Sequence, residues 1–155
     1  MSAQRLRIPI IGGCIAGTMA ACVLREHHNV TIYERGNEHA IGGGKAISFS
    51  PGSFKILNEY GFDADRTGSV KWLGFKVYYR DGTLKKTFPI NAVQSFGAEW
   101  LMALRADAGD EILRIATAES AGLGRKLDPH RVVYGVKAVD VDVDFGIVTL
   151  GMVRL

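Results

Sequence analysis

The chain has 155 residues, of which 47% are hydrophobic and 23% are charged, and its formal net charge is +3. This length and composition predict one globular domain that buries its own core. The basic residues are scattered along the sequence, which argues against a nucleic-acid-binding surface. No apolar run is long enough to span a membrane, and no signal peptide precedes the first predicted strand, so we expect a cytoplasmic protein.

Residues that commonly form disulfides or bind metals are few. Cys14 and Cys22 would lie on one turn and helix with their Cα atoms about 12 Å apart, which is too far for a disulfide. Two free thiols fit a reducing compartment. The four histidines show no metal-ligand spacing with each other or with the cysteines, so we expect no metal site.

The N-terminal residues predict a strand, a glycine turn, a helix and a second strand. Residues 8–11 form a short apolar strand, which Gly12 and Gly13 end. Apolar and small residues then recur at helical spacing over 15–24. The second strand, 30–34, ends on an acid. This order of elements within about thirty residues is typical of a dinucleotide-binding βαβ unit.

The glycines and the acid have separate tasks in such a unit. Gly12 permits the sharp turn, and Gly17 allows the helix to pack closely on the strand. The helix N-terminus supplies partial positive charge for phosphate groups. Glu34 follows Gly12 by about 20 positions, where an acid that binds a ribose hydroxyl is expected. In the alternative interpretation, the glycines serve only to pack the helix on the sheet.

Two residues depart from this pattern. Cys14 occupies the position of the middle glycine in the pattern G-x-G-x-x-G. Gly13 is adjacent to that position but out of register. The Cβ and Sγ atoms of Cys14 would press on a pyrophosphate unless the loop shifts slightly, so we expect weaker cofactor binding than a full fingerprint gives. Pro9 lies within the first strand, where a proline in a central strand removes a ladder hydrogen bond.

The middle of the chain begins with a glycine-rich loop over 35–44. We expect this loop either to approach the same ligand or to act as a flexible linker. A short extended segment, 46–50, precedes a helix over 53–60, which Pro51 opens and Gly61 ends. The apolar positions of this helix are expected to pack in the core.

Residues 72–88 predict a β-hairpin with a two-residue turn at Asp81-Gly82. The hairpin interrupts the alternation of strands and helices, so we expect it to lie outside the nucleotide-binding core. Its aromatic residues are expected to pack on the core, and in the alternative they line a substrate surface. These residues are Trp72, Phe75, Tyr78 and Tyr79.

The C-terminal third combines one helix with a β-rich tail. A helix is predicted over 108–121, with Asp107 as its N-cap. Arg105 stands just before this helix, where a charge faces solvent unless it has a function. Three aspartates in the tail indicate a solvated strand face rather than a cation site, because the glycine and final glutamate of a calcium loop are missing. These aspartates are Asp140, Asp142 and Asp144, and the strands are predicted over 131–136, 138–143 and 147–150.

Four segments together resemble the N-terminal part of a known enzyme family. They occur in the same order and at similar spacing over 10–17, 32–35, 44–51 and 104–107. The family is the group A flavoprotein monooxygenases, the salicylate and p-hydroxybenzoate hydroxylase-like enzymes common in fungal secondary metabolism. The resemblance covers residues 7–120.

The resemblance implies an α/β fold, in which a Rossmann-like FAD-binding sheet with an N-terminal βαβ unit carries an added β-hairpin and a β-rich C-terminal tail. It implies one partial FAD-binding domain over 1–155. Glu34 would hold the adenosine ribose and Arg35 would lie along the adenine. The Ala46 backbone would meet the ribityl chain, and Arg105 would reach the FAD. The cofactor-binding residues implied are Gly12, Gly13, Cys14, Ile15, Ala16, Gly17, Glu34, Arg35, Ala46 and Arg105.

The resemblance also implies an activity. In the family, NADPH or NADH reduces FAD, and the reduced flavin uses oxygen to hydroxylate or epoxidise a small organic substrate. No catalytic residue is identified in this sequence, and Gly52 stands where the family has an asparagine. The family's later Asp-Gly and Gly-Asp motifs, which touch FAD, are absent from the 155 residues. The sequence therefore carries only the first part of the family's FAD-binding fold.

Two alternatives follow from the missing motifs and from Cys14. In the first, the chain is a truncated homologue without redox activity that acts as a cyclase, an isomerase or a binding scaffold. In the second, a partner chain or a second copy of this chain completes the fold, because truncation leaves strand edges and apolar surface uncovered.

Overall fold

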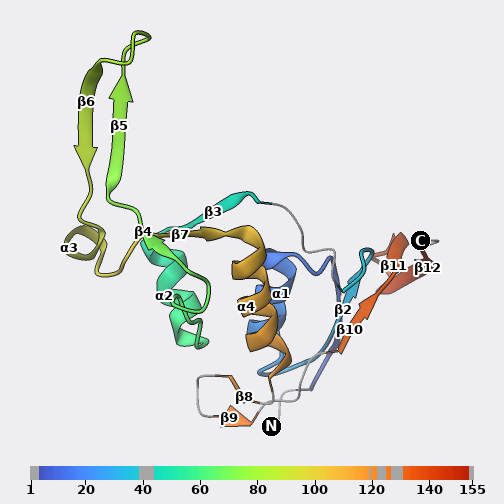
Figure 1. Cartoon of the computed structure of the whole chain (residues 1–155). Helices are drawn as coiled ribbons and strands as arrows, with labels where there is room; N and C mark the ends of the chain where they lie inside the picture. The colour runs from blue at the N-terminus through green and yellow to red at the C-terminus, as the bar shows by residue number, and fades with distance from the viewer. Residues whose placement is uncertain (1–3, 39–43, 119, 122–124, 127–130, 154–155) are drawn as a thin grey trace.

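The computed structural model describes residues 4–38, 44–118, 120–121, 125–126 and 131–153. Its body combines a parallel sheet with packed helices, and a long β-hairpin projects away from this body (Figure 1). This arrangement confirms the expected α/β fold with an added hairpin and a β-rich tail. Of the helices in these ranges, none has both the length and the apolar character needed to cross a membrane.

Three parallel strands form the sheet in the order β1-β2-β10: β1 (Arg7–Ile11), β2 (Asn29–Glu34) and β10 (Arg131–Tyr134). Helix α1 (Ile15–Leu24) connects the first two strands, which confirms the predicted βαβ unit. Strand β10 pairs with β2 and aligns Val132 with Ile32. The sequence patterns predict β10 as a strand but do not indicate that it joins the N-terminal sheet.

Strand β1 is an edge strand among the described residues, and this position accommodates Pro9. The Asn29 N–H donates to the Leu6 carbonyl oxygen at 2.8 Å. The Gly12 N–H donates to the Tyr33 carbonyl oxygen at 2.9 Å. In a parallel ladder every second residue bonds to the same neighbour, so the nitrogen of Pro9 faces the open side of β1. The expected loss of a ladder hydrogen bond at Pro9 is therefore wrong for this sheet.

Helix α1 separates two clusters of buried side chains. On the side of the sheet, Ala21 packs with Val30 and Ile32. On the other side, Cys22 belongs to a larger cluster that includes α4 (Arg105–Thr117). This cluster also takes side chains from three further elements: β3 (Ala46–Phe49), α2 (Pro51–Glu59) and β7 (Leu101–Leu104).

A second, antiparallel sheet leads into α4. Its strand order is β3-β7-β4, with β4 (Val70–Lys71) at one edge. Helix α4 begins at Arg105, whose N–H donates to the Lys45 carbonyl oxygen at 2.8 Å. The predicted start at residue 108 with Asp107 as N-cap is therefore wrong. Asp107 instead lies in the first turn, where the helix dipole favours a negative charge.

Helix α2 also begins earlier than predicted, at Pro51. The Ser50 side chain is its N-cap and accepts a hydrogen bond from the Ser53 N–H at 3.3 Å. Proline suits the first helical position because its missing N–H would have no partner there. A short helix, α3 (Ala92–Phe96), contacts α2 and follows the projecting hairpin.

Arg25 joins the two central helices. Its side chain is buried, and its guanidinium donates to the carbonyl oxygens of Ile115, Ala116 and Ala118 at the end of α4. Carbonyl groups at a helix C-terminus have no partner within the helix, and a cation complements the negative end of the helix dipole. Burial lowers the pKa of Arg25. The prediction that this helix extends to residue 121 is wrong, because α4 ends at Thr117 and Ser120–Ala121 form a short strand.

The projecting hairpin consists of β5 (Gly74–Tyr78) and β6 (Leu84–Pro89), which among the described strands pair with each other alone. The predicted two-residue turn is wrong. The Tyr79 N–H donates to the Thr83 carbonyl oxygen at 2.8 Å. Gly82 has a φ of 86°, and its N–H donates to the Tyr79 carbonyl oxygen at 3.0 Å. The turn is thus longer and is closed by a left-handed glycine.

The aromatic residues of this hairpin divide into two groups. At its base, Trp72 packs against Trp100 with ring centroids 4.3 Å apart, and Phe75 stacks on Trp72 at 6.2 Å. Tyr78 and Tyr79 are each 54% exposed on the projecting part. The expectation that all four aromatic residues pack on the core is therefore wrong for these two tyrosines and for Phe75, which is 47% exposed.

The C-terminal strands β11 (Val136–Asp142) and β12 (Ile147–Met152) form an antiparallel hairpin. Gly135, at a φ of 70°, separates β11 from β10, so the strand predicted over 131–136 divides in two. The Asp142 Oδ1 atom accepts hydrogen bonds from the N–H groups of Asp144 and Phe145, both at 3.1 Å, and so orders the turn. Two short strands, β8 (Ser120–Ala121) and β9 (Arg125–Lys126), pair with each other.

Glu111 is a buried acid that ties the loop after α2 to α4. Its carboxylate accepts hydrogen bonds from Arg114 Nη2 at 2.6 Å and from Arg66 Nε at 3.1 Å. The Asp63 backbone N–H donates a further bond at 3.1 Å. The hydrogen bond from Arg114 is the largest cause that holds the pKa of Glu111 below its usual range, although burial opposes the shift.

We expect Glu111→Gln to destabilise the fold by about 2 kcal/mol, because the two arginines lose their charged acceptor. Since the folded pKa is lowered, the stabilisation by Glu111 is complete above its ordinary pKa of 4.5 and is lost as the pH falls through the folded value. Between about pH 5 and pH 3 the variant should therefore lose less stability than the wild type. Urea unfolding at several pH values measures both effects. Asp110→Asn, at the exposed neighbouring position, is the control. Equal effects of the two substitutions would contradict the assigned role of Glu111.

Candidate functional site

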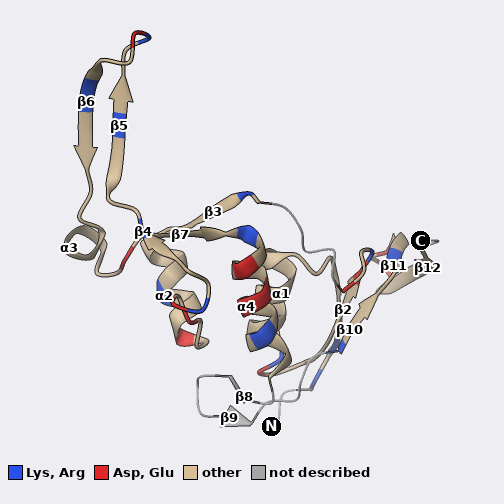
Figure 2. Cartoon of the chain, in the orientation of Figure 1, with Lys and Arg blue, Asp and Glu red and all other residues tan. Residues whose placement is uncertain are grey.

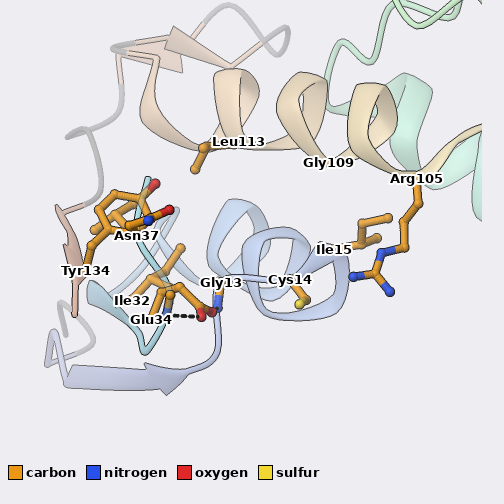
Figure 3. Close-up of a pocket in the computed structure, with 12 residues that line it drawn as sticks. Gly13, Cys14, Ile15, Ile32, Glu34, Asn37, Arg105, Gly109, Leu113 and Tyr134 are labelled. Carbon is orange, nitrogen blue, oxygen red and sulfur yellow. Dashed lines mark hydrogen bonds between the residues drawn. The ribbon is translucent and has the colours of Figure 1, made fainter. Parts of the chain in front are cut away.

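A pocket lies at the carboxyl ends of β2 and β10, between the start of α1 and α4 (Figure 3). Parallel strands commonly place ligands at this end of a sheet. The pocket is lined by Gly13, Cys14, Ile15, Ile32, Glu34, Gly36, Asn37, Arg105, Gly109, Leu113, Val132 and Tyr134.

Two glycines shape the loop between β1 and α1. Gly12 has a φ of 102°, a conformation that side-chain-bearing residues rarely adopt. A Cβ atom on Gly17 would lie 2.0 Å from the Gly12 carbonyl oxygen, so only glycine allows α1 to approach this closely. The Thr18 hydroxyl donates to the Gly13 carbonyl oxygen at 2.9 Å and fixes the loop to the first turn of α1. This geometry agrees with the turn and packing roles expected from the sequence.

Glu34 connects this loop to the segment that follows β2. Its Oε2 atom accepts a hydrogen bond from the Gly13 N–H at 2.6 Å, and its Oε1 atom accepts one from the Gly36 N–H at 2.7 Å (Figure 3). An ionised carboxylate has about four acceptor sites, so two remain for a ligand. Glu34 therefore both orders the wall of the pocket and keeps the capacity to accept hydroxyl groups.

Gly13 is a crowded position in this loop. A Cβ atom on Gly13 would lie 3.3 Å from the Glu34 Cβ, closer than most side-chain contacts. Cys14 is the N-cap of α1, yet its side chain makes no cap hydrogen bond and is exposed at the pocket. The first N–H groups of α1 thus have no acceptor from the capping residue, and they remain available to an anion.

Arg105 faces this loop from the first position of α4. Figure 3 shows its exposed side chain extending from α4 toward the start of α1, near Ile15. The backbone of Arg105 is held by the hydrogen bond to Lys45, the residue before β3, and this contact helps to place the cation at the pocket. Arg105 was expected either to face solvent or to reach the ligand. Its exposed side chain at the pocket is compatible with both expectations.

The structure brings together only some of the residues expected to bind the cofactor. Gly13, Cys14, Ile15, Glu34 and Arg105 line the pocket. The other five do not line it: Gly12 and Gly17 shape the loop, while Ala16, Arg35 and Ala46 lie outside the lining with exposed side chains.

Gly36 and Asn37 line the pocket and belong to the loop over 35–44, which was expected either to approach the ligand or to act as a linker. Several other lining residues were missed by the sequence analysis, because they come from α4 and β10. Tyr134 is the clearest example. Burial raises its pKa, and the negative charges of Glu38 and Glu34 add to the shift. Its position at the carboxyl end of an apolar strand would have indicated the site if that strand had been assigned to the parallel sheet.

Comparison with solved structures identifies the class of fold. The structure of p-nitrophenol 4-monooxygenase from Pseudomonas putida matches with a TM-score of 0.74 at 18% sequence identity, covering 95% of this chain and 36% of that chain. The fold is therefore the N-terminal Rossmann-type fold of the FAD-binding monooxygenases.

Sequence comparison gives two particular relatives. The 3-amino-4-hydroxybenzoate 2-monooxygenase of Streptomyces platensis is 32% identical over 124 residues, covering 74% of this chain and 30% of that protein. Hispidin-3-hydroxylase of Neonothopanus nambi is 29% identical over 140 residues, covering 88% of this chain and 32% of that protein. No protein-family profile matches the chain. The chain thus spans less than a third of these relatives, and its resemblance to the N-terminal part of FAD-dependent monooxygenases is confirmed.

The two cysteines are expected to differ in reactivity. Cys14 is exposed at the pocket, whereas Cys22 is buried and burial raises its thiol pKa to about 11. Because the thiolate is the reactive form, Ellman's reagent at about pH 8 should modify Cys14 quickly and Cys22 only after unfolding. Cys14→Ser should remove the fast reaction, while Cys22→Ser should keep it. Rapid modification of both thiols in the folded protein would contradict the placement of Cys22.

Proposed function

We propose that this chain binds FAD at the pocket and forms the cofactor-binding part of a monooxygenase that acts on a small aromatic substrate. The observation that carries the proposal is Glu34, whose carboxylate joins the glycine loop to the segment after β2 and keeps free acceptor sites at the pocket. The two monooxygenase relatives support the class of reaction. The similar fold supports the cofactor.

The residues at the pocket suit the ADP part of FAD. The start of α1 has no side-chain cap, so its N–H groups and dipole would hold the pyrophosphate. Glu34 would accept the ribose hydroxyls with its remaining lone pairs. Arg105 would add a cation from the opposite wall. Arg35 and Ala46, which lie outside the lining, would contact the adenine and the ribityl chain.

The bound flavin, reduced by NADPH or NADH, would supply the oxygen chemistry. The part of the reaction that belongs to these 155 residues is to bind and orient the cofactor, and we assign no catalytic side chain. The chain spans less than a third of its relatives, so hydroxylation would also require the counterpart of their remaining length.

The first test is the visible absorption spectrum of the purified chain before and after incubation with FAD and desalting. We expect absorbance in the flavin bands to remain with the protein, because the pocket would hold the ADP part. Bound FAD should also slow the reaction of Cys14 with Ellman's reagent, since Cys14 lines the pocket. A chain that is folded by circular dichroism, retains no flavin and shows no protection would overturn the proposal. That result would favour the non-redox alternative of a cyclase, isomerase or binding scaffold.

A second prediction concerns Glu34. Glu34→Gln replaces one acceptor oxygen by an NH₂ donor that faces backbone N–H groups. We expect the Kd for FAD, measured by quenching of flavin fluorescence, to rise about tenfold or more, equivalent to ~1.4 kcal/mol. Glu38→Gln makes the same charge change at an exposed residue outside the lining, and should alter the Kd by about twofold or less. A similar rise in the Kd of both variants would show that FAD binding depends on the charge near the pocket and not on the contacts of Glu34.

A further inference from the structure

One face of α4 borders the pocket, and the three residues on this face have very different side chains. Arg105, Gly109 and Leu113 follow one another at a spacing of four residues, and all three line the pocket. Residues four apart lie on the same face of a helix, one turn after the other. This face of α4 therefore presents a cation, then no side chain, and then an apolar side chain (Figure 3).

Glycine is an unfavourable residue for position 109. Helix α4 runs from Arg105 to Thr117, so Gly109 lies in its interior and does not end it. Gly109 does not have a positive φ, so no left-handed conformation requires glycine there. Because glycine loses more backbone freedom than alanine in a helix, its presence at this position calls for another explanation.

The missing side chain faces the groups assigned to the ligand. Figure 3 shows α4 on one side of the pocket, with the loop of Gly13 and Glu34 on the other side. A Cβ atom at position 109 would lie between those of Arg105 and Leu113, on the face that borders the pocket. A side chain at this position would therefore take space from the pocket.

The neighbours of Gly109 give the pocket two chemically different ends. Near the start of α1, the Arg105 side chain and the uncapped N–H groups of the helix favour an anion (Figure 3). At the other end, Leu113 lies on the same side as Asn37 and Tyr134, where apolar and aromatic atoms suit an uncharged ring (Figure 3). A ligand that fills both ends has to pass Gly109.

We propose that Gly109 is a specificity-determining residue, whose missing side chain leaves the clearance through which the ADP part of FAD passes. This inference rests on the proposed function and deepens it, because it names the position on α4 that decides whether the nucleotide fits. Favourable contacts with the ligand then offset the conformational cost of glycine in the helix.

A purely structural role for Gly109 predicts a different outcome. Helices α1 and α4 pack against each other in the core, and a glycine at such a contact can permit a close approach. Gly17 has this role at the β1 loop, where a Cβ atom would lie 2.0 Å from a carbonyl oxygen. The two roles of Gly109 therefore differ in what an added Cβ atom does to the stability of the fold.

Thermal unfolding of Gly109→Ala without ligand separates the two roles. If the Cβ atom enters the pocket, alanine favours the helix without a collision, and the Tm should rise by about 3 °C. If glycine is needed for the packing of α4 on α1, the Cβ atom would collide and the Tm should fall. A fall in the Tm would overturn the proposal.

FAD binding, measured by quenching of flavin fluorescence, tests the clearance directly. Gly109→Leu introduces a good helix former that fills the space, so the chain should stay folded while the Kd for FAD rises about tenfold or more. Gly109→Ala adds a single methyl group and should raise the Kd less. The inhibition constant of ADP as a competitor should rise in parallel, because the clearance concerns the ADP part.

The matched control is Thr117→Leu, which places the same side chain at an exposed position in the last turn of α4, outside the lining. Its Kd for FAD should stay within about twofold of the wild-type value. A wild-type chain that retains no FAD would refute the proposed function, and this inference with it. A wild-type chain that binds FAD, together with an unchanged Kd in Gly109→Leu, would overturn the role of Gly109 alone.

Discussion

Helix α1 is the element on which both halves of the body depend, because it is buried on two sides. Ala21 packs toward the parallel sheet and Cys22 toward α4. The close approach of α1 to the β1 loop requires glycine at position 17, since any Cβ there would collide with the Gly12 carbonyl oxygen. The same contact sets the position of the α1 N-terminus at the pocket. Packing of the core and geometry of the site therefore share one steric constraint.

Glu34 serves the folded chain independently of any ligand. By accepting the N–H groups of Gly13 and Gly36, it satisfies two backbone donors and holds two loop segments together. A site whose walls are already ordered loses less conformational entropy when a ligand binds. In this pocket, the acid of the dinucleotide fingerprint acts as a structural residue as well as a candidate ligand contact.

Charged residues inside the body have hydrogen-bonding partners in the same chain, whereas charged residues on the hairpins lie on exposed surface. Arg25 donates hydrogen bonds to carbonyl oxygens at the end of α4, and Glu111 is paired with two arginines. These charges stabilise contacts between elements of one chain. Lys85 and Lys86 of β6 and the aspartates of β11 lie on exposed strands instead, with the body of the molecule between them (Figure 2). Their separation by sign gives the molecule two dissimilar ends.

The sequence by itself determined the elements that depend on short-range spacing. The βαβ unit, the place of Glu34, helix α2, the hairpin of β5 and β6, and the strands of the C-terminal tail follow from periodicity and glycine positions. The start of α4 at Arg105 was predicted wrongly because the Arg105 N–H bonds to the carbonyl oxygen of Lys45, a residue distant in the sequence. The tertiary structure alone decided that β10 joins β2 and brings Tyr134 to the pocket. Pairing between strands that are distant in the sequence leaves no local periodic pattern. The wall of the pocket that β10 forms could therefore not be predicted from the sequence.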